Sequence, residues 1–283
     1  MKKITVVLFC LVCLLALSLT ACSQPAASTP PAAPPAETPT AAPPEGEDTS
    51  WTDIQAKGYM VVGLDASFPP MGFTDPSGEI VGFDIDFAKA VAEKLGIEVR
   101  FEPISWDAKF LELNNKNIDL IWNGMTITEE RLAETLMTRP YLGNRQIIVV
   151  PGDSTLSKAD LPEKTIGVQA GSTSADVLQA DVELMETIAM VEFPDNVAAL
   201  LDLKNGQLDA VVVDEVVGRY YVNLDAASYK ILEEDFGEEE FGVAVRKTDA
   251  AFLAELQGAM DAVVADGQAA VIATQWFNEN IVK

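Results

Sequence analysis

The chain carries one pattern twice, LNNKNIDLI at residues 113–121 and LKNGQLDAV at residues 203–211. In each copy a helical segment ends in a tight polar turn, and an apolar-Asp-apolar sequence then enters a strand. A match of this length also arises between unrelated helix-turn-strand units. As a true repeat, it predicts two lobes of similar construction, with a cleft between them that suits a small ligand.

Segments with strand and helix patterns alternate on both sides of the repeat. Predicted strands lie at 59–64, 97–101, 118–122, 147–150, 165–168 and 208–213, and predicted helices at 83–95 and 110–115. This alternation is typical of a mainly parallel sheet flanked by helices. The predicted fold class is therefore α/β, and the 233 residues from Trp51 onward have room for two lobes.

The first 22 residues have the pattern of an export signal. Two lysines precede an apolar run at 4–19, and Leu19-Thr20-Ala21-Cys22 follows. These four residues resemble the lipobox of bacterial lipoproteins, in which the Cys is acylated after cleavage. An uncleaved span is the alternative, but the run is shorter than the about 20 residues that cross a bilayer. We expect a lipoprotein signal peptide at 1–21 and a lipid anchor, including palmitate, on Cys22.

A polar segment follows the signal. Residues 23–50 contain eight Pro, seven Ala and four acidic residues, with no basic or large apolar residue. Such a segment buries too little surface to offset the entropy of ordering, so residues 22–50 are predicted to form a disordered tether. Cys10 and Cys13 lie within the signal and leave with it. The folded body then has no thiol.

Composition excludes several kinds of site. The 283 residues include no His, 19 Lys+Arg and 44 Asp+Glu, for a formal charge of -25. Without imidazole, Ser-His-Asp and Cys-His catalytic systems and His-built metal sites are excluded. The acidity, uninterrupted by a basic block, excludes binding to nucleic-acid phosphates. We expect no metal, no cofactor and no nucleic-acid partner.

The first candidate ligand site is at 123–131, where a predicted strand meets a predicted helix. Thr128 followed by two acidic residues is typical of a helix N-terminus. Backbone N–H groups, the Thr126 hydroxyl and the Arg131 guanidinium would meet there, and a guanidinium binds a carboxylate through two parallel hydrogen bonds. The spacing equally permits an ion pair between Arg131 and Glu130 or Glu134.

The second candidate is at 169–174, between a strand and a helical pattern that begins near Ala175. Gly171 permits close approach of the backbone, and Ser172 and Thr173 supply hydroxyl groups at a helix N-terminus. The same residues also fit an ordinary N-cap after a glycine turn.

Further candidates follow other predicted strands. Asp214 comes at the carboxyl end of a strand, where α/β sheets open toward a crevice, and its carboxylate suits an ammonium group. Asp65 has the equivalent place in the first half of the body. Phe68 and Trp106 are placed to stack on a ligand side chain, although aromatic residues more often pack in a core.

The body resembles the bacterial polar amino-acid-binding proteins of ABC transporters, which have the type-II periplasmic-binding fold. The resemblance covers nearly all of residues 51–283, through segments at 63–71, 82–86, 124–131, 167–173, 209–214, 241–246 and 275–277.

This resemblance implies a two-lobed Venus-flytrap. Lobe one would comprise 51–144 and 243–283, and lobe two 145–242, with hinge strands near 146–151 and 241–245. The implied function is that of a monomeric protein on the extracytoplasmic face of the cell membrane, which captures a free amino acid for an ABC permease. The alternatives are an enzyme of the same fold, such as a cyclohexadienyl dehydratase-like lyase with Glu215 or Asp65 as acid, and a sensory module. We expect that the protein is not an enzyme and has no catalytic residue.

The resemblance also implies roles in binding. Arg131 would take the α-carboxylate, helped by Thr126, Ser172 and Thr173, while Asp214 and carbonyls near Gly124 take the α-ammonium. Selectivity for the side chain would belong to Asp65, Phe68, Trp106, Asn123 and Gln169.

Two positions depart from the family pattern. Trp122-Asn123 stands where small or hydroxyl residues are usual, and Thr138-Arg139 stands where Ser-Asp is usual. Neither departure affects the expected grip on the amino-acid backbone. Both departures leave the side chain of the ligand undetermined, and a neutral polar or cationic amino acid is favoured.

Overall fold

The computed structural model describes Gly46 and residues 48–283. The predicted signal peptide, Cys22 and most of the predicted tether lie outside the described residues. The helices are α1 (Ser50–Lys57), α2 (Phe83–Leu95), α3 (Lys109–Asn114), α4 (Glu129–Glu134), α5 (Thr173–Ala180), α6 (Val182–Met185), α7 (Asn196–Lys204), α8 (Glu215–Leu224), α9 (Ala250–Ala265) and α10 (Gln268–Phe277). Short 3-10 helices are at Trp106–Ala108 and Lys158–Asp160.

Most strands belong to one nine-stranded sheet. The strands are β1 (Tyr59–Leu64), β2 (Ser67–Phe68), β3 (Gly72–Thr74), β4 (Ile80–Val81), β5 (Glu98–Pro103), β6 (Leu120–Thr126), β7 (Thr135–Met137), β8 (Leu142–Pro151), β9 (Thr165–Gln169), β10 (Ala189–Phe193), β11 (Ala210–Asp214) and β12 (Tyr229–Arg246). The sheet has the order β10-β9-β11-β8-β12-β6-β1-β5, with β7 paired to β12. Strands β2, β3 and β4 form a small separate sheet.

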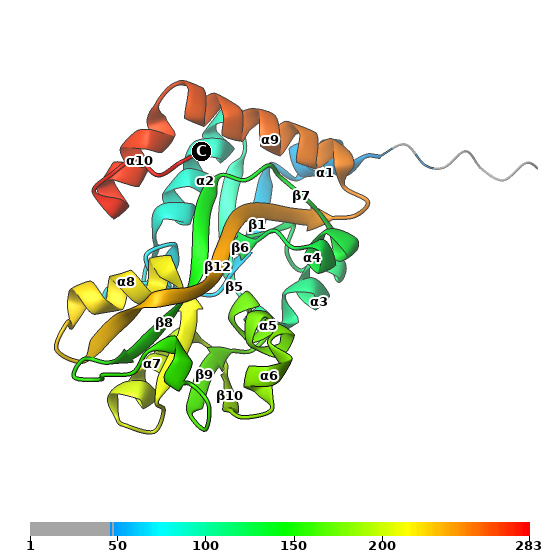
Figure 1. Cartoon of the computed structure of the whole chain (residues 1–283). Helices are drawn as coiled ribbons and strands as arrows, with labels where there is room; N and C mark the ends of the chain where they lie inside the picture. Colours follow the sequence, from blue (N-terminus) through cyan, green and yellow to red (C-terminus); the bar gives the residue numbers. More distant parts are fainter. Residues whose placement is uncertain (1–45, 47) are drawn as a thin grey trace, which may run out of the picture. The chain divides into compact units, whose positions relative to one another are not determined.

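The long strands β8 and β12 divide this sheet into two halves (Figure 1). In one half β1 pairs in parallel with β5 and β6, and in the other β9 pairs in parallel with β10 and β11. We call the half with β6, β1 and β5 and its helices lobe one, and the half with β11, β9 and β10 and its helices lobe two. The predicted α/β fold with two mainly parallel lobes is confirmed, and both predicted hinge segments lie within β8 and β12.

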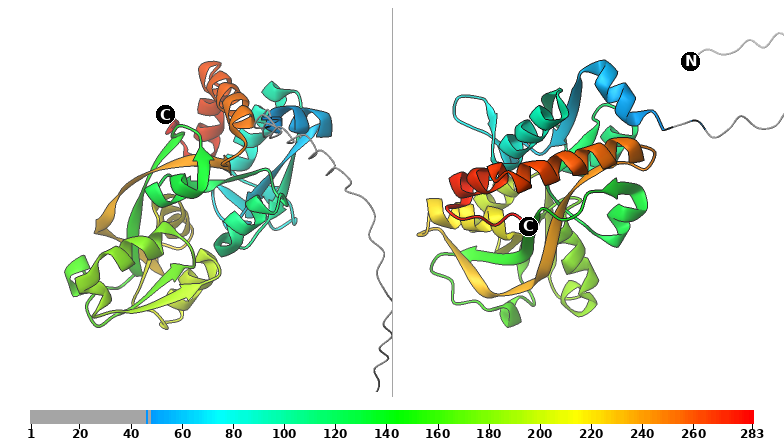
Figure 2. Two further views of the ribbon diagram at one scale, coloured as in Figure 1. Left: turned by 90° about the vertical axis from the view of Figure 1, so that its right-hand side faces the viewer. Right: turned by 90° about the horizontal axis from the view of Figure 1, so that it is seen from above.

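Lobe one is covered by helices from both ends of the described chain. Figures 1 and 2 show α1 (blue) beside α9 (orange), and α2 packs against α9 and α10. Helix α2 has the bounds predicted, because its apolar residues recur on one face and Gly96 caps it in a left-handed conformation. Phe83 and Phe87 on the buried face of α2 form an aromatic cluster with Tyr141.

The body begins slightly before the predicted boundary at Trp51. Ser50 is the first residue of α1, and its Oγ accepts a hydrogen bond of 3.0 Å from the N–H of Phe252 on α9. Asp48 Oδ2 accepts another, of 2.6 Å, from the N–H of Ala251. The last residues of the predicted 22–50 tether are therefore part of the body, because their side chains cap the start of α9.

The repeated sequence forms the same unit in each lobe. Asp119 Oδ2 accepts a hydrogen bond of 2.7 Å from the N–H of Val61 on β1, and Asp209 Oδ2 accepts one of 2.8 Å from the N–H of Thr165 on β9. Each aspartate thus ties the start of its own strand to the neighbouring parallel strand. The prediction of two similarly constructed lobes is confirmed.

Within the described part of the chain, no helix combines the length and the apolar character needed to cross a bilayer. The same residues hold no group of three or more acidic or cysteine side chains arranged to bind a metal ion.

Candidate ligand-binding site

The candidate site is a narrow cavity between the two lobes, and the about 260 Å³ of space among its lining residues includes space that is open to solvent. It lies at the carboxyl ends of β1, β6, β9 and β11, which is where α/β folds usually bind ligands. Ten of the eleven residues predicted to bind ligand line it, namely Phe68, Trp106, Asn123, Gly124, Thr126, Arg131, Gln169, Ser172, Thr173 and Asp214. The eleventh, Asp65, lies next to the cavity, hydrogen-bonded to Gln169.

Arg131 brings a buried positive charge to the cavity. It lies in the first turn of α4, whose N-cap Thr128 accepts a hydrogen bond of 3.1 Å from the Arg131 N–H, as predicted. The side chain is only 5% exposed, and Nη1 donates to the Thr126 carbonyl at 3.0 Å. Among residues 48–283 no salt bridge involves Arg131, so the alternative of an ion pair with Glu130 or Glu134 is wrong. Burial lowers the pKa of Arg131.

Hydroxyl groups from both lobes meet beside Arg131. Thr126 Oγ1 of lobe one lies 3.3 Å from Thr173 Oγ1 of lobe two. Ser172 acts as the N-cap of α5, since its Oγ accepts from the Ala175 N–H and donates to the Gln169 carbonyl. The N-cap alternative is therefore correct for the Ser172 hydroxyl, although the residue also lines the cavity.

Asp214 supplies a buried carboxylate from lobe two. It ends β11 and is 5% exposed. Its Oδ1 accepts hydrogen bonds from Asn144 Nδ2 at 2.7 Å and from Gln146 Nε2 at 2.9 Å. Burial and the nearby carboxylate of Glu239 raise the pKa of Asp214 to about 7, against the opposing influence of Arg131. An ammonium group of a ligand would favour the ionised form.

Asp65 and Gln169 join the two lobes at the other end of the cavity. Gln169 Nε2 donates to Asp65 Oδ2 at 2.7 Å, and Asn196 Nδ2 donates to Gln169 Oε1 at 3.0 Å. Asn123 Oδ1 accepts a hydrogen bond of 3.1 Å from the Asp65 N–H. Burial raises the pKa of Asp65. This end of the site is therefore polar, with one carboxylate and two amides.

Phe68 and Trp106 line the cavity and also pack in the core. Both line the cavity, yet they are only 5% and 6% exposed and each packs into a hydrophobic cluster. They form its apolar walls.

The two departures from the family pattern lie largely outside the cavity. Trp122 is fully buried against Phe87 and Tyr141, so only Asn123 of that pair reaches the site. Thr138 Oγ1 accepts a hydrogen bond from the Val243 N–H on β12, and Arg139 pairs with an aspartate of α9. Thr138 thus contributes to the pairing of a long connecting strand.

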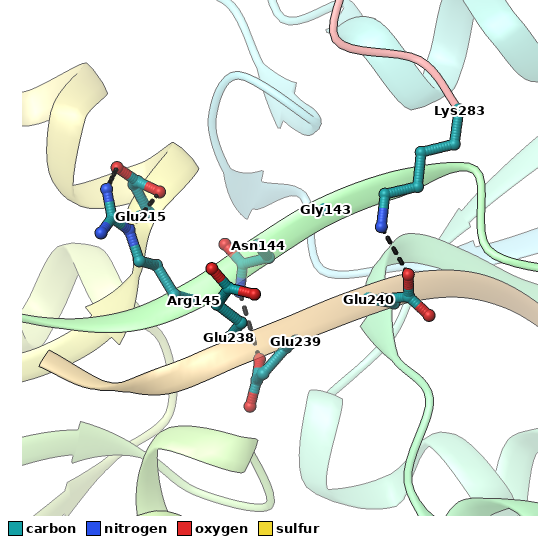
Figure 3. Close-up of a pocket in the computed structure, with 8 residues that line it drawn as sticks. All are labelled: Gly143, Asn144, Arg145, Glu215, Glu238, Glu239, Glu240 and Lys283. Atoms are coloured by element: carbon teal, nitrogen blue, oxygen red, sulfur yellow. Dashed lines mark hydrogen bonds and ion pairs between the residues drawn. The ribbon is translucent and has the colours of Figure 1, made fainter.

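Four residues near the cavity were not predicted from the sequence. Asn144 and Gln146 lie on β8, and Glu239 lies on β12, where Figure 3 shows its side chain hydrogen-bonded to Asn144. Lys109 begins α3, and its Nζ donates across the cleft to the Gly171 carbonyl at 2.9 Å. Burial and the charge of Arg131 lower the pKa of Lys109 to about 8. Of these four, only Glu239 had a signal in the sequence. Side chains of a strand alternate between its two faces, so the middle residue of the run 238–240 is expected on the face opposite the other two.

Two α/β lobes joined by two long strands, with a buried cation and a buried carboxylate facing one cavity, define the class of two-lobed ligand-binding proteins. Residues 60–279 match the bacterial extracellular solute-binding proteins, family 3. The chain belongs to this family.

Relatives and solved structures agree with this assignment. The L-cystine-binding protein TcyJ of Escherichia coli K12 is 29% identical over 233 residues, which cover 81% of this chain and 86% of that protein. The ABC transporter arginine-binding protein 1 of the same organism is 32% identical over 76% of this chain and 89% of its own. An ABC uptake transporter substrate-binding protein from Streptococcus pneumoniae, solved with bound histidine, has a TM-score of 0.80 and 34% identity, covering 83% of this chain and 98% of that chain.

Proposed function

We propose that the protein captures a free amino acid, polar or cationic in its side chain, between its two lobes and delivers it to the permease of an ABC transporter. The single observation that carries the proposal is the buried guanidinium of Arg131, which faces the cavity with no ion-pair partner among residues 48–283. A buried charge that has no carboxylate within ion-pair distance is costly unless a ligand supplies the opposite charge. An α-carboxylate has the charge and the planar geometry to do so.

The two ends of an amino acid match the two lobes. Arg131 on lobe one would bind the α-carboxylate, assisted by Thr126 and by the start of α5 at Ser172 and Thr173. Asp214 on lobe two would bind the α-ammonium, together with carbonyl groups near Gly124. Because both grips act only when the lobes are together, the ligand would stabilise the closed arrangement that the permease recognises.

The residues at the far end of the cavity support a preference for one kind of ligand side chain. Asp65, Asn123 and Gln169 offer polar groups, and Phe68 and Trp106 offer flat apolar walls, on which a planar cation can stack. Relatives include arginine-binding and histidine-complexed proteins. A cationic amino acid therefore fits this end best, with a neutral polar one as the second choice.

The proposal includes the place of action. A lipid on Cys22 would hold the protein at the extracytoplasmic face of the cell membrane, and the residues up to about Asp48 would act as the tether. The lobes would be 51–144 with 243–283, and 145–242, working as a monomer without a cofactor or catalytic residue.

A lyase of the same fold is less well supported by the site. Lyase chemistry needs a protonated acid facing the cavity. Glu215 does not line the cavity, and its carboxylate pairs with Arg145 at 2.8 Å and with Arg219 at 2.6 Å. These arginines lower the pKa of Glu215, so it stays ionised. Burial raises the pKa of the other candidate, Asp65, but its carboxylate already accepts hydrogen bonds from Gln169 and from the Ser67 N–H, which oppose that rise.

Thermal unfolding of the purified chain with each of the twenty amino acids tests the proposal. A ligand at 100 times its Kd stabilises a protein by about 2.7 kcal/mol, so a true ligand raises the Tm by several degrees. Turnover of prephenate is measured alongside. Turnover of prephenate, with no stabilisation by any amino acid, would contradict the proposal and favour the lyase. A sensory role predicts the same binding and is separated from transport by uptake of labelled amino acid in cells that lack this chain.

A further inference from the structure

The middle residue of an acidic triplet on β12, Glu239, lines the solvent-open pocket drawn in Figure 3, and it also contacts two threonines of the separate ligand cavity. Figure 3 shows Glu239 on the side of the strand opposite Glu238 and Glu240. Its neighbours are exposed, and Glu240 pairs with the C-terminal residue Lys283, whereas Glu239 is half-buried. The triplet thus divides into two surface carboxylates and one carboxylate that faces the interior.

One oxygen of Glu239 lies within hydrogen-bonding distance of four donors from three parts of the molecule. Glu239 Oε2 is 2.9 Å from Thr126 Oγ1 of lobe one and 3.3 Å from Thr173 Oγ1 of lobe two. It is also 2.9 Å from Gln146 Nε2 and 3.1 Å from Asn144 Nδ2, both on β8. Both threonines line the ligand cavity, so Glu239 lies directly behind the wall of the site.

The same two amides also bind the carboxylate of Asp214. Asn144 Nδ2 is 2.7 Å and Gln146 Nε2 is 2.9 Å from Asp214 Oδ1. Two carboxylates therefore converge on two neutral amide groups, which stabilise negative charge but cannot cancel it. Within residues 48–283 neither Asp214 nor Glu239 takes part in a salt bridge. The pair has an excess of negative charge that a ligand cation can offset.

We infer that Glu239 is the second carboxylate of the ammonium subsite, and that it positions and strengthens the grip of Asp214 on the positive end of the ligand. The inference rests on the proposed amino-acid function and extends it to a residue on the connecting strand. Glu239 acts through the shared amides and through its charge, so it is a positioning residue and need not touch the ligand.

The charges around the pair determine how binding depends on pH. Asp214 on β11 and Glu239 on β12 face each other, Arg131 on α4 is the cation that acts on both, and Asp176 on α5 also acts on Arg131. After burial, the charge of Glu239 is the largest influence that raises the pKa of Asp214 to about 7. In the empty protein Asp214 is therefore mostly protonated at pH 6 and mostly ionised at pH 8. Because a ligand ammonium needs the ionised form, binding weakens by about tenfold from pH 8 to pH 6.

Calorimetry on two matched variants at both pH values tests the inference. Glu239→Gln removes the charge and keeps the size of the side chain, and Glu238→Gln removes the adjacent, exposed charge on the opposite side of the strand. The titrant is whichever of the twenty amino acids gives the largest rise in Tm with the unmodified chain. Thermal unfolding without ligand establishes that both variants fold.

The expected result is specific to Glu239. Glu239→Gln weakens binding at pH 8 by about tenfold, because a charge close to the ammonium is lost. It also makes the difference between pH 8 and pH 6 smaller than the about tenfold of the unmodified chain, because one of the two causes that raise the pKa of Asp214 is removed and burial alone remains. Glu238→Gln leaves the affinity and its pH dependence within about twofold of the unmodified chain.

Two outcomes overturn the inference. If Glu239→Gln weakens binding but keeps the tenfold pH dependence, or behaves like Glu238→Gln, then Glu239 only braces the strand, while loss of binding in Arg131→Ala still upholds the proposed function. If no amino acid binds the unmodified chain at any pH, the proposed function and this inference fail together.

Discussion

The two lobes share a scaffold but differ in the side chains that the scaffold presents to the cavity. In each lobe an aspartate ties its strand to the parallel neighbour, Asp119 to Val61 and Asp209 to Thr165. In each lobe a glycine on that neighbour, Gly63 or Gly167, packs closely against an apolar side chain, because an added Cβ would lie 2.3 Å from Ile118 Cδ1 in one lobe and 2.5 Å from Leu208 Cδ1 in the other. Buried packing is thus repeated closely.

The differences begin two residues beyond those glycines. Asp65 follows Gly63 and Gln169 follows Gly167, and the two side chains hydrogen-bond to each other at 2.7 Å across the cleft. Arg131 belongs to lobe one alone and Asp214 to lobe two alone. Folding therefore restricts which residues can occupy the buried interior of the repeat. The residues at the strand ends are not restricted in this way, and in the two lobes they carry opposite charges. Such a site would distinguish the two ends of the proposed zwitterionic ligand.

Removing the positive charge that lobe one alone contributes should have the largest effect on ligand affinity. Arg131→Ala is expected to cost about 2 to 5 kcal/mol of binding free energy, or about 30-fold to several-thousand-fold in affinity, because a desolvated carboxylate loses its partner. Isothermal titration calorimetry with the cognate amino acid measures this loss of affinity. Arg139→Ala removes an exposed arginine of the same lobe that pairs with Asp261, and it serves as the control. Unchanged affinity in Arg131→Ala would refute the role of the guanidinium.

The shared aspartates should differ in their contribution to stability. Asp119 also lies 2.5 Å from Lys57 Nζ and 3.8 Å from Arg246, whereas Asp209 forms no salt bridge among residues 48–283. We expect Asp119→Ala to lower the free energy of unfolding by about 2 to 3 kcal/mol and Asp209→Ala by about 1 kcal/mol. Urea denaturation of the two variants measures both. Equal losses would show that only the backbone hydrogen bond matters.

Lys109 has no charged counterpart in lobe two, and its titration should make the stability of the fold depend on pH. The repeat places the small, fully buried Ala199 of lobe two at the position that corresponds to Lys109, four residues before the leucine that begins each copy. The pKa of Lys109 is lowered to about 8, so the folded protein binds fewer protons than the unfolded chain between pH 8 and about 10.5. Stability should therefore rise with pH in this range.

Between pH 7.5 and pH 9.5 the unmodified chain should gain about 1 to 2 kcal/mol relative to Lys109→Met, which keeps the length of the side chain but cannot titrate. Urea denaturation of both proteins at the two pH values measures this difference. A constant difference between the two proteins would mean that Lys109 is not buried in solution.

The turn within the repeat should give the smallest effects. Lys116 has φ 62° where the equivalent Gly206 has φ 71°, so both residues adopt the left-handed conformation. Lys116→Gly should raise the free energy of unfolding by about 0.5 to 1 kcal/mol, and Gly206→Lys should lower it by about 1 kcal/mol, since only glycine adopts this conformation without a steric cost. Thermal or urea unfolding of the exchanged pair measures this, and opposite signs are the expected outcome.

Local patterns were enough for six of the twelve strands and for some of the helices in the described part of the chain. The predicted bounds of β1 and α2 match the structure, because alternation and 3.6-residue periodicity are local properties that end at glycines. The N-cap at Thr128 was likewise predicted, since a cap depends on residues only three apart. Ten of the eleven predicted binding residues line one cavity because they lie in or after the last residues of strands whose carboxyl ends meet.

The sequence by itself therefore determined the α/β class, the repeat and the strand ends that form the cavity. Only the tertiary structure decided that Glu239, Asn144 and Gln146 converge on Asp214, that Lys109 reaches the Gly171 carbonyl, and that Arg131 has no carboxylate partner in the described part of the chain. Each of these contacts joins residues far apart along the chain. Their geometry depends on how β8 and β12 cross the sheet and bring the lobes together, and no local sequence pattern contains that information.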